Sequence, residues 1–150
     1  MNHLKMIEAV LAQSEMEPIK GSLEDWLASK AHPKADIITR WVTALEPDRY
    51  EQTQYHLTDG HGHCCLGVLC DILKPESEDA STALLIRAAK LPISIADELG
   101  MGTMGRFTNS TYDLPLCLCL SEFNDTYGFD FKEIARFIKE YPYLIFGAYA

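Results

Sequence analysis

Histidines and cysteines are concentrated between positions 61 and 71, where the chain runs His61-Gly62-His63-Cys64-Cys65-Leu66-Gly67-Val68-Leu69-Cys70-Asp71. Imidazoles and thiolates serve as metal ligands and as catalytic groups, so this segment carries the residue types for two kinds of chemistry. The same pattern is also typical of a polar turn that leads into a buried apolar helix. The segment therefore leaves open a metal site, a catalytic site and a purely structural role.

A zinc site is the first chemistry to consider. The donors available to it are His61, His63, Cys64, Cys65, Cys117 and Cys119. Their spacing is unfavourable, because structural zinc sites place about two to four residues between paired cysteines. Here one pair is adjacent and the other is separated by a single residue, and helical side chains at such spacings do not face each other. We predict buried thiols beside a solvated His-Gly-His turn, with neither a metal nor a cofactor.

A cysteine nucleophile is the alternative chemistry. Cys64 or Cys65 stands at the predicted start of a helix, where the backbone amides and the helix dipole can lower a thiol pKa. Papain-like peptidases carry a cysteine in such a place, but their histidine follows it in the chain, and no histidine follows His63 here. His61 or His63 would have to act as the base from upstream. A cysteine-dependent hydrolase or transferase therefore stays open as a second functional class.

A glycine-rich loop lies near position 100. Residues 100–105 read Gly-Met-Gly-Thr-Met-Gly and match the dinucleotide-binding pattern G-x-G-x-x-G. The context differs from that of a nucleotide site, because the pattern follows a predicted helix rather than a strand and opens no helix of its own. We expect a loop in which Arg106, with Thr108 and Asn109, can hold an anionic ligand.

Two further polar pairs can contact a ligand. The first is Asn124-Asp125, at the end of a leucine-rich helix, and the second is Arg49-Tyr50, shortly after Pro47. Asparagine and aspartate are also typical of helix ends and turns, and for the first pair we favour that structural role. The ligand contacts predicted outside the glycine-rich loop are Arg49, Tyr50, His63, Cys64, Asn124 and Asp125.

The elements that must position these side chains are mostly helices. Apolar residues at helical spacing predict helices over residues 3–14, after Ser22, and between Pro33 and Pro47. The apolar run 65–73 predicts a buried helix. Alternating polar and apolar residues before Asp59-Gly60 predict a small β-hairpin near residues 54–64.

The second half of the chain has clearer helix boundaries. Helices are expected over residues 82–90, 93–99 and 114–127, with Gly100 and Gly128 ending the last two in the left-handed conformation. Asp130 and Glu133 form a capping-box pattern, so a final helix should begin there and end before Pro142. Together these elements predict an α+β fold that is mainly helical, a single domain with helices 65–73 and 114–127 at its centre.

Composition limits the cellular setting and the partners. Thirteen basic and twenty-two acidic residues give a net charge of −9, which opposes contact with free nucleic acid and with anionic membranes. No apolar run approaches the length of a membrane span, and the first residues lack the pattern of a signal peptide. The five cysteines are an odd number and fit reduced, buried thiols. These observations predict a cytoplasmic protein.

Several of these segments together resemble a family of small uncharacterised proteins of tailed phages and prophages. The segments are Trp41-Val42-Thr43-Ala44-Leu45, Tyr50, the His63–Asp71 run, Leu91-Pro92, and Phe123-Asn124-Asp125-x-x-Gly128-x-Asp130-Phe131-x-x-Ile134-Ala135-x-x-Ile138. The resemblance covers residues 41–138, and its Cys-Cys-Leu-Gly-Val-Leu-Cys-Asp core is the most specific part. It implies a phage setting and the host bacterial cytoplasm, and it supplies no catalytic residues. Residues 1–34 lie outside it and are expected to form a helical extension.

The leading functional hypothesis is therefore a phage-encoded, non-enzymatic accessory protein that binds and blocks a host component. The partner would be a defence protein or a small signalling nucleotide, and self-association stays open. The alternatives are the cysteine-dependent enzyme and a minor virion or assembly protein. The hypothesis rests on the phage resemblance, the small acidic chain and the incomplete catalytic set.

Overall fold

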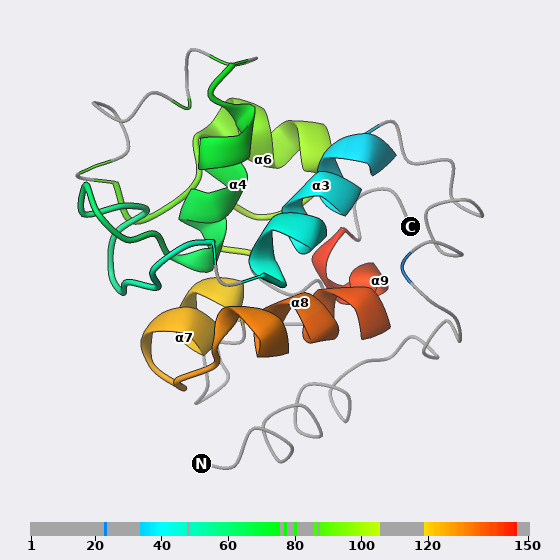
Figure 1. Ribbon diagram of the computed structural model, residues 1–150. Coiled ribbons are helices and arrows are strands. Elements are labelled where there is room, and N and C mark those ends of the chain that lie inside the picture. Colours follow the sequence, from blue (N-terminus) through cyan, green and yellow to red (C-terminus); the bar gives the residue numbers. More distant parts are fainter. Residues whose placement is uncertain are drawn as a thin grey trace, which may run out of the picture.

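Helices account for most of the chain described by the computed structural model (Figure 1). The described residues are 23, 34–47, 49–75, 77, 80, 86, 88–105 and 119–146. The predicted helix over 3–14 lies outside them, as does the helix after Ser22 apart from Leu23. Of the helix predicted over 82–90, residues 86 and 88–90 are described and are not helical, and the other five lie outside the described residues. The helices, in chain order, are α3 (Ala35–Leu45), α4 (Cys65–Leu73), α6 (Ile93–Leu99), α7 (Leu120–Asp125), α8 (Phe131–Glu140) and α9 (Pro142–Ile145).

Helix α4 forms the centre of the core. All its residues except Asp71 and Ile72 are buried, as the continuous apolar run predicts. It packs between α3 and α7, while α3 also crosses α8 (Figure 1). The indole nitrogen of Trp41 on α3 donates a hydrogen bond of 2.9 Å to the carbonyl oxygen of Cys65. Because Trp41 is fully buried, this bond satisfies its only polar atom and joins α3 to the start of α4.

Local sequence signals account for several helix boundaries. Asp130 and Glu133 form both hydrogen bonds of the predicted capping box at the start of α8. Gly100 follows α6 with a left-handed φ of 67°, which confirms the predicted stop. Helix α7 ends at Asp125, earlier than predicted, and the left-handed Gly128 with a φ of 71° lies in the turn before α8. Lys139 of α8 forms an ion pair with Glu46, directly after α3.

The predicted β-hairpin near residues 54–64 is wrong. Residues 49–63, which we call the arm, contain two isolated bridges, in which His63 pairs with both Gln52 and Thr58. The amide of Leu57 donates to the carbonyl of Ala88 instead of to an opposing strand. Some backbone groups of the arm bond to one another and others bond to Ala88 and Cys64, so no continuous ladder of hydrogen bonds forms. The described part of the fold is therefore mainly α-helical, without a sheet.

None of the helices in the described ranges is both long enough and apolar enough to span a bilayer.

Candidate functional site

Asp71, on the last turn of α4, gathers three side chains around its carboxylate. The hydroxyl of Tyr50 donates a hydrogen bond of 2.6 Å to one carboxylate oxygen. The ammonium of Lys74 lies 2.9 Å from the other oxygen, and Nε2 of His63 lies 3.8 Å from it. The rings of Tyr50 and His63 meet edge to face, with centroids 5.1 Å apart. The two ends of the arm thus lie beside the same residue, and Tyr50 is hydrogen-bonded to it. We call Tyr50, His63, Asp71 and Lys74 the Asp71 cluster.

Partial burial sets the protonation of the Asp71 cluster. Burial acts to raise the pKa of Asp71, but the hydrogen bonds from Tyr50 and Lys74 outweigh it and hold that pKa below its usual value. Burial and the hydrogen bond to Asp71 raise the pKa of Tyr50 to about 12. Burial lowers the pKa of His63, against the opposing effect of Asp71. At neutral pH the cluster holds a carboxylate, a phenol, an ammonium and a neutral imidazole.

His63 also carries an unsatisfied polar atom. Its Nδ1 is buried and has no hydrogen-bond partner within the described part of the chain. A neutral imidazole tolerates this position better than an imidazolium, whose second N–H would have to be buried without an acceptor. This buried position therefore favours the uncharged imidazole.

Acidification is expected to destabilise the fold through His63. Because the folded pKa lies below the ordinary value of 6.5, the unfolded chain takes up the proton first. The stabilisation that comes from the neutral His63 is therefore complete above about pH 6.5, and it is lost as the pH falls toward the lower pKa of the folded state. Urea unfolding at about pH 7.5 and about pH 5 should give a smaller decline for His63→Gln than for the wild type. The exposed His61→Gln is the control, and an equal decline in both variants would contradict the assignment.

Asn124 of α7 fastens the first part of the arm, at Gln52 and Thr53. It is fully buried, and its side-chain oxygen accepts from the amide of Cys65 at 3.2 Å and from Nε2 of Gln52 at 2.8 Å. Its nitrogen donates to the carbonyl of Thr53 and to the carboxylate of Asp125, both at 2.8 Å. The first amides of a helix have no partner within the helix, so Asn124 caps α4 from a distant segment. The carboxamide is used in full by the protein itself.

The cysteines of the central motif belong to the core. Cys64 is the N-cap of α4, and its sulfur accepts a hydrogen bond of 3.4 Å from the amide of Gly67. Burial nevertheless raises the pKa of Cys64 to about 11 and that of Cys70 to about 12. Burial also raises the pKa of the fully buried Cys65 well above its ordinary value. Desolvation outweighs the helix amides, which is the opposite of what an activated nucleophile requires.

Thiol labelling provides a direct measurement. In a Cys117→Ser variant, which leaves Cys64, Cys65, Cys70 and Cys119, we expect almost no reaction with a thiol reagent at neutral pH in the folded state. All four should react after unfolding in denaturant. One thiol that reacts rapidly in the folded protein would instead favour the cysteine-dependent enzyme.

Tyr55 stands out at the surface of the arm. Its side chain is 65% exposed, and its backbone adopts a φ of 71°. A bulky residue with a positive φ is a strained conformation, whereas glycine adopts it freely. Burial of the side chain does not explain this strain, because Tyr55 is exposed.

Relieving this strain should stabilise the protein. We expect Tyr55→Gly to raise the free energy of unfolding by about 0.5–1 kcal/mol, although it removes a large side chain. Tyr55→Ala retains the unfavourable φ and should leave stability nearly unchanged. Chemical denaturation of both variants tests this, and a loss of stability in Tyr55→Gly would contradict the strain.

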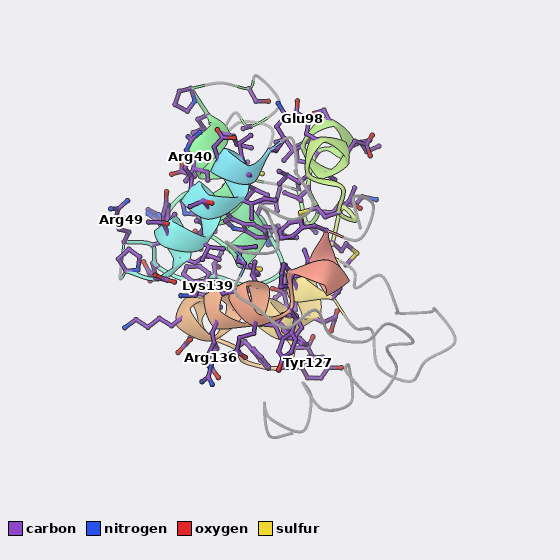
Figure 2. All side chains as sticks on the ribbon, turned by 90° about the vertical axis from the view of Figure 1, so that its right-hand side faces the viewer. Arg40, Arg49, Glu98, Tyr127, Arg136 and Lys139 are labelled. Atoms are coloured by element: carbon purple, nitrogen blue, oxygen red, sulfur yellow. The ribbon has the colours of Figure 1, made fainter. Side chains whose placement is uncertain are left out.

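The remaining predicted residues are less closely grouped. Arg49 is exposed and extends from the surface (Figure 2), while Cys64 lies in the core. Asp125 contacts Asn124 and, at 3.4 Å, the hydroxyl of Ser121. Arg106, Thr108 and Asn109 lie outside the described residues, so an anion site there stays a prediction.

The glycine-rich loop that precedes Arg106 packs against α7. The amides of Leu120 and Ser121 donate to the carbonyls of Gly105 and Met104. Gly105 has a left-handed φ of 68°, and a Cβ atom there would lie 2.7 Å from the Leu120 side chain. Gly105 therefore allows the loop to approach α7 closely.

The sequence interpretation missed four residues of this region. Gln52 was not recognised as the partner of a residue 72 positions away. Tyr55 belongs to the alternation that predicted the hairpin, and that pattern gives no sign of its positive φ. Asp71 and Lys74 are three residues apart at the end of a predicted helix, a spacing that would have indicated their ion pair.

Comparison with known proteins identifies a family whose model covers most of the described residues. No curated protein and no solved structure matches the chain significantly. A family model described as a domain of unknown function, DUF8296, matches residues 33–142, from just before α3 to the start of α9. The matched region includes the arm, the central cysteine motif and the residues that fasten them. The chain therefore belongs to the DUF8296 family.

Proposed function

We propose that this protein is a phage-encoded, non-enzymatic accessory protein that binds a host component in the bacterial cytoplasm and blocks it, and that the arm is its binding element. The strained, exposed Tyr55 is the observation that carries the proposal. Tyrosine is enriched among the residues that dominate protein interfaces, so an exposed tyrosine on an ordered segment favours a protein as the partner. The phage setting rests on the sequence resemblance.

The way in which the arm is fastened supports a binding role. Tyr50 is bonded to Asp71, and Gln52 and Thr53 are bonded to Asn124. The backbone of His63, at the other end of the arm, is bonded to Glu51 and Thr53. A loop already ordered in its binding conformation loses less conformational entropy on association. The buried, protonated thiols beneath the arm also favour binding over cysteine catalysis.

Charge indicates the kind of surface that the partner presents. The chain carries a net charge of −9, so a basic patch on the partner would complement it and accelerate association. A host protein that itself contacts nucleic acid has such a patch. A free nucleotide, which is an anion, is a less suitable ligand for this surface.

Site-specific crosslinking in infected bacteria tests the proposal. A photo-reactive phenylalanine analogue at position 55 should crosslink to one host protein, whereas the same analogue at the exposed position of Lys132 on α8 should not. With that purified partner, Tyr55→Ala should weaken binding by about thirtyfold, and the exposed Ile93→Ala on α6 should leave it unchanged.

Other results would overturn this function. Specific crosslinks to virion proteins, with the protein retained in purified particles, would favour an assembly role. A small-molecule mass in native mass spectra of the protein from infected cells, without any protein crosslink at position 55, would favour a small ligand. Unchanged affinity of Tyr55→Ala for the crosslinked partner would remove the arm from the interface.

A further inference from the structure

The arm carries the only aspartate of the chain that is followed by glycine, Asp59-Gly60. In a flexible chain such a pair rearranges without an enzyme. The glycine nitrogen bonds to Cγ of the protonated aspartic acid, the carboxyl OH leaves with the amide proton as water, and a five-membered imide ring closes. One water then opens the ring by breaking the bond between this nitrogen and the main-chain carbonyl carbon. The product is an isoaspartate, whose main chain runs through the former side chain.

The electrophile of this reaction, the Asp59 carboxyl group, is engaged in the folded arm. One of its oxygens accepts from the amide of His61 at 2.9 Å and from the amide of Gly62 at 2.7 Å. The hydroxyl of Thr53 donates to the other oxygen at 3.4 Å. The hydrogen bonds from Gly62 and His61 hold the pKa of Asp59 below its usual value. Imide formation needs the protonated carboxyl, so this ionised carboxylate is unreactive.

The nucleophile, the amide nitrogen of Gly60, is engaged as well. It donates to the hydroxyl oxygen of Thr58 at 3.1 Å, and this hydroxyl donates to the carbonyl of Gly62 at 2.7 Å. Thr58 is only 3% exposed, so packing limits the movement of its side chain. Gly62 is packed closely too, since a Cβ atom there would lie 2.8 Å from the carbonyl oxygen of Glu51. The turn is therefore held by the rest of the arm.

Ring closure would require the Asp59 side chain to turn toward the Gly60 nitrogen and to leave both amides that it accepts from. We propose that Asp59-Gly60 is the site of aspartate isomerisation in this protein, and that the folded turn suppresses the reaction until the arm opens. Isoaspartate adds one carbon to the main chain at position 59, so the turn cannot close again in the same geometry. This chemistry does not depend on whether the arm binds a partner.

Peptide mapping after long incubation at neutral pH tests the proposal. Isomerisation leaves the mass unchanged, so isoaspartate is detected with a protein isoaspartyl methyltransferase and located by fragmentation of the main chain. Folded protein should form it at position 59 at least about tenfold more slowly than a synthetic peptide of residues 53–63 does. Equal rates would overturn the protection. In denaturant, faster isomerisation at any other aspartate would overturn the choice of site.

Variants of Thr58 test the part played by the turn. Thr58→Val removes the acceptor of the Gly60 amide, while the Gly62 carbonyl keeps the amide of Asp59 as a donor at 3.3 Å. Isomerisation should become about threefold faster or more, and Thr58→Ser should restore the wild-type rate. Thr126→Val, which removes an exposed hydroxyl elsewhere, is the control.

An unchanged rate in Thr58→Val, with the folded state verified by circular dichroism, would overturn the proposal. If that variant does not fold, the comparison of the wild type with the peptide decides alone. Crosslinking from position 55 does not report on this reaction, so this proposal and the proposed function fail independently.

Discussion

Gly67→Ala is expected to destabilise the protein by about 3 kcal/mol or more, enough to unfold a marginally stable domain. A Cβ atom on Gly67 would overlap the carbonyl oxygen of Leu57 and lie 2.7 Å from its carbonyl carbon. Both obstacles are backbone atoms of the arm, so no side-chain rotation can relieve the clash. The same carbonyl oxygen accepts a hydrogen bond of 3.1 Å from the amide of Cys64, which would be lost as the arm moves away.

Helix propensity alone predicts the opposite sign for this substitution, because alanine favours a helix over glycine by about 1 kcal/mol. Gly128→Ala is the matched control. Gly128 has a φ of 71°, but no atom of the described residues lies within 4 Å of the place that a Cβ would take, so the variant should lose only about 1 kcal/mol through its backbone conformation. Urea denaturation of both variants measures the difference. A neutral or stabilising Gly67→Ala would mean that the arm does not rest on α4.

Asn124→Ala is expected to lower the free energy of unfolding by about 2–4 kcal/mol. The substitution removes the acceptor of the buried Cys65 amide and the donor to the Thr53 carbonyl, and each group left unsatisfied costs about 1–3 kcal/mol. It also releases Gln52 from one of its two bonds, the other being to the carbonyl of Phe129 at 2.8 Å. We expect the arm to loosen as the start of α4 loses its cap.

A double-mutant cycle separates the contributions. Gln52→Ala alone should cost less than Asn124→Ala, and the double variant should cost less than the sum, because the two side chains share a hydrogen bond. Thr126→Ala is the control on the same segment, since its hydroxyl makes an exposed bond to Glu122 and should contribute under about 0.5 kcal/mol. Additive effects of Gln52 and Asn124 would show that they act separately.

Asn124 also illustrates why the candidate site was only partly predictable. The sequence placed it at a helix end, and α7 does end directly after it, at Asp125. Its partners Cys65, Gln52 and Thr53 lie between 59 and 72 positions away in the chain. No spacing rule joins residues so distant, and a buried carboxamide and a ligand-binding one look the same in a sequence. In the fold this carboxamide makes structural hydrogen bonds, and a ligand contact there stays a prediction.

The hairpin prediction failed for a similar reason. Alternation around Tyr55 and Leu57 matched a strand, but Leu57 is buried beneath α4 and its amide is bonded to Ala88. The Asp59 side chain accepts from the amides of His61 and Gly62, which closes a turn without a ladder. Side-chain acceptors and distant carbonyls thus satisfied the backbone groups that a hairpin would have paired.

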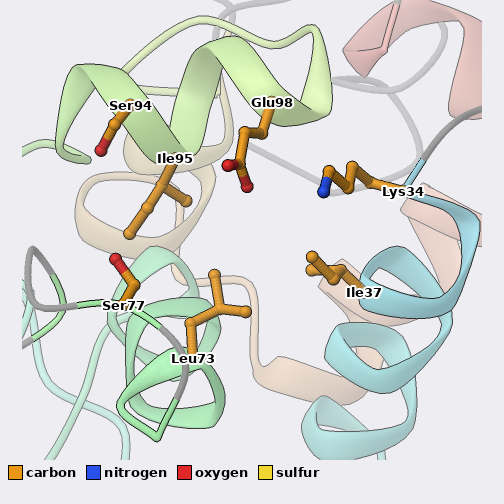
Figure 3. A pocket seen from close by; sticks show the side chains of 7 residues that line it. All are labelled: Lys34, Ile37, Leu73, Ser77, Ser94, Ile95 and Glu98. Atoms are coloured by element: carbon orange, nitrogen blue, oxygen red, sulfur yellow. The ribbon is translucent and has the colours of Figure 1, made fainter.

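What the sequence determined by itself is the set of elements whose signals are local. The apolar run 65–73 became α4 with the same bounds, Asp130 and Glu133 began α8, and Gly100 ended α6. Each of these signals acts within about four residues, the span of one helical hydrogen bond. Four features were decided only by tertiary structure. They are the raised pKa values of the thiols, the positive φ of Tyr55, the grouping of side chains around Asp71, and a pocket at the end of α4 that Ile37, Leu73 and Ile95 help to line (Figure 3). These depend on burial and on contacts between distant segments, and such contacts exist only once the helices have packed.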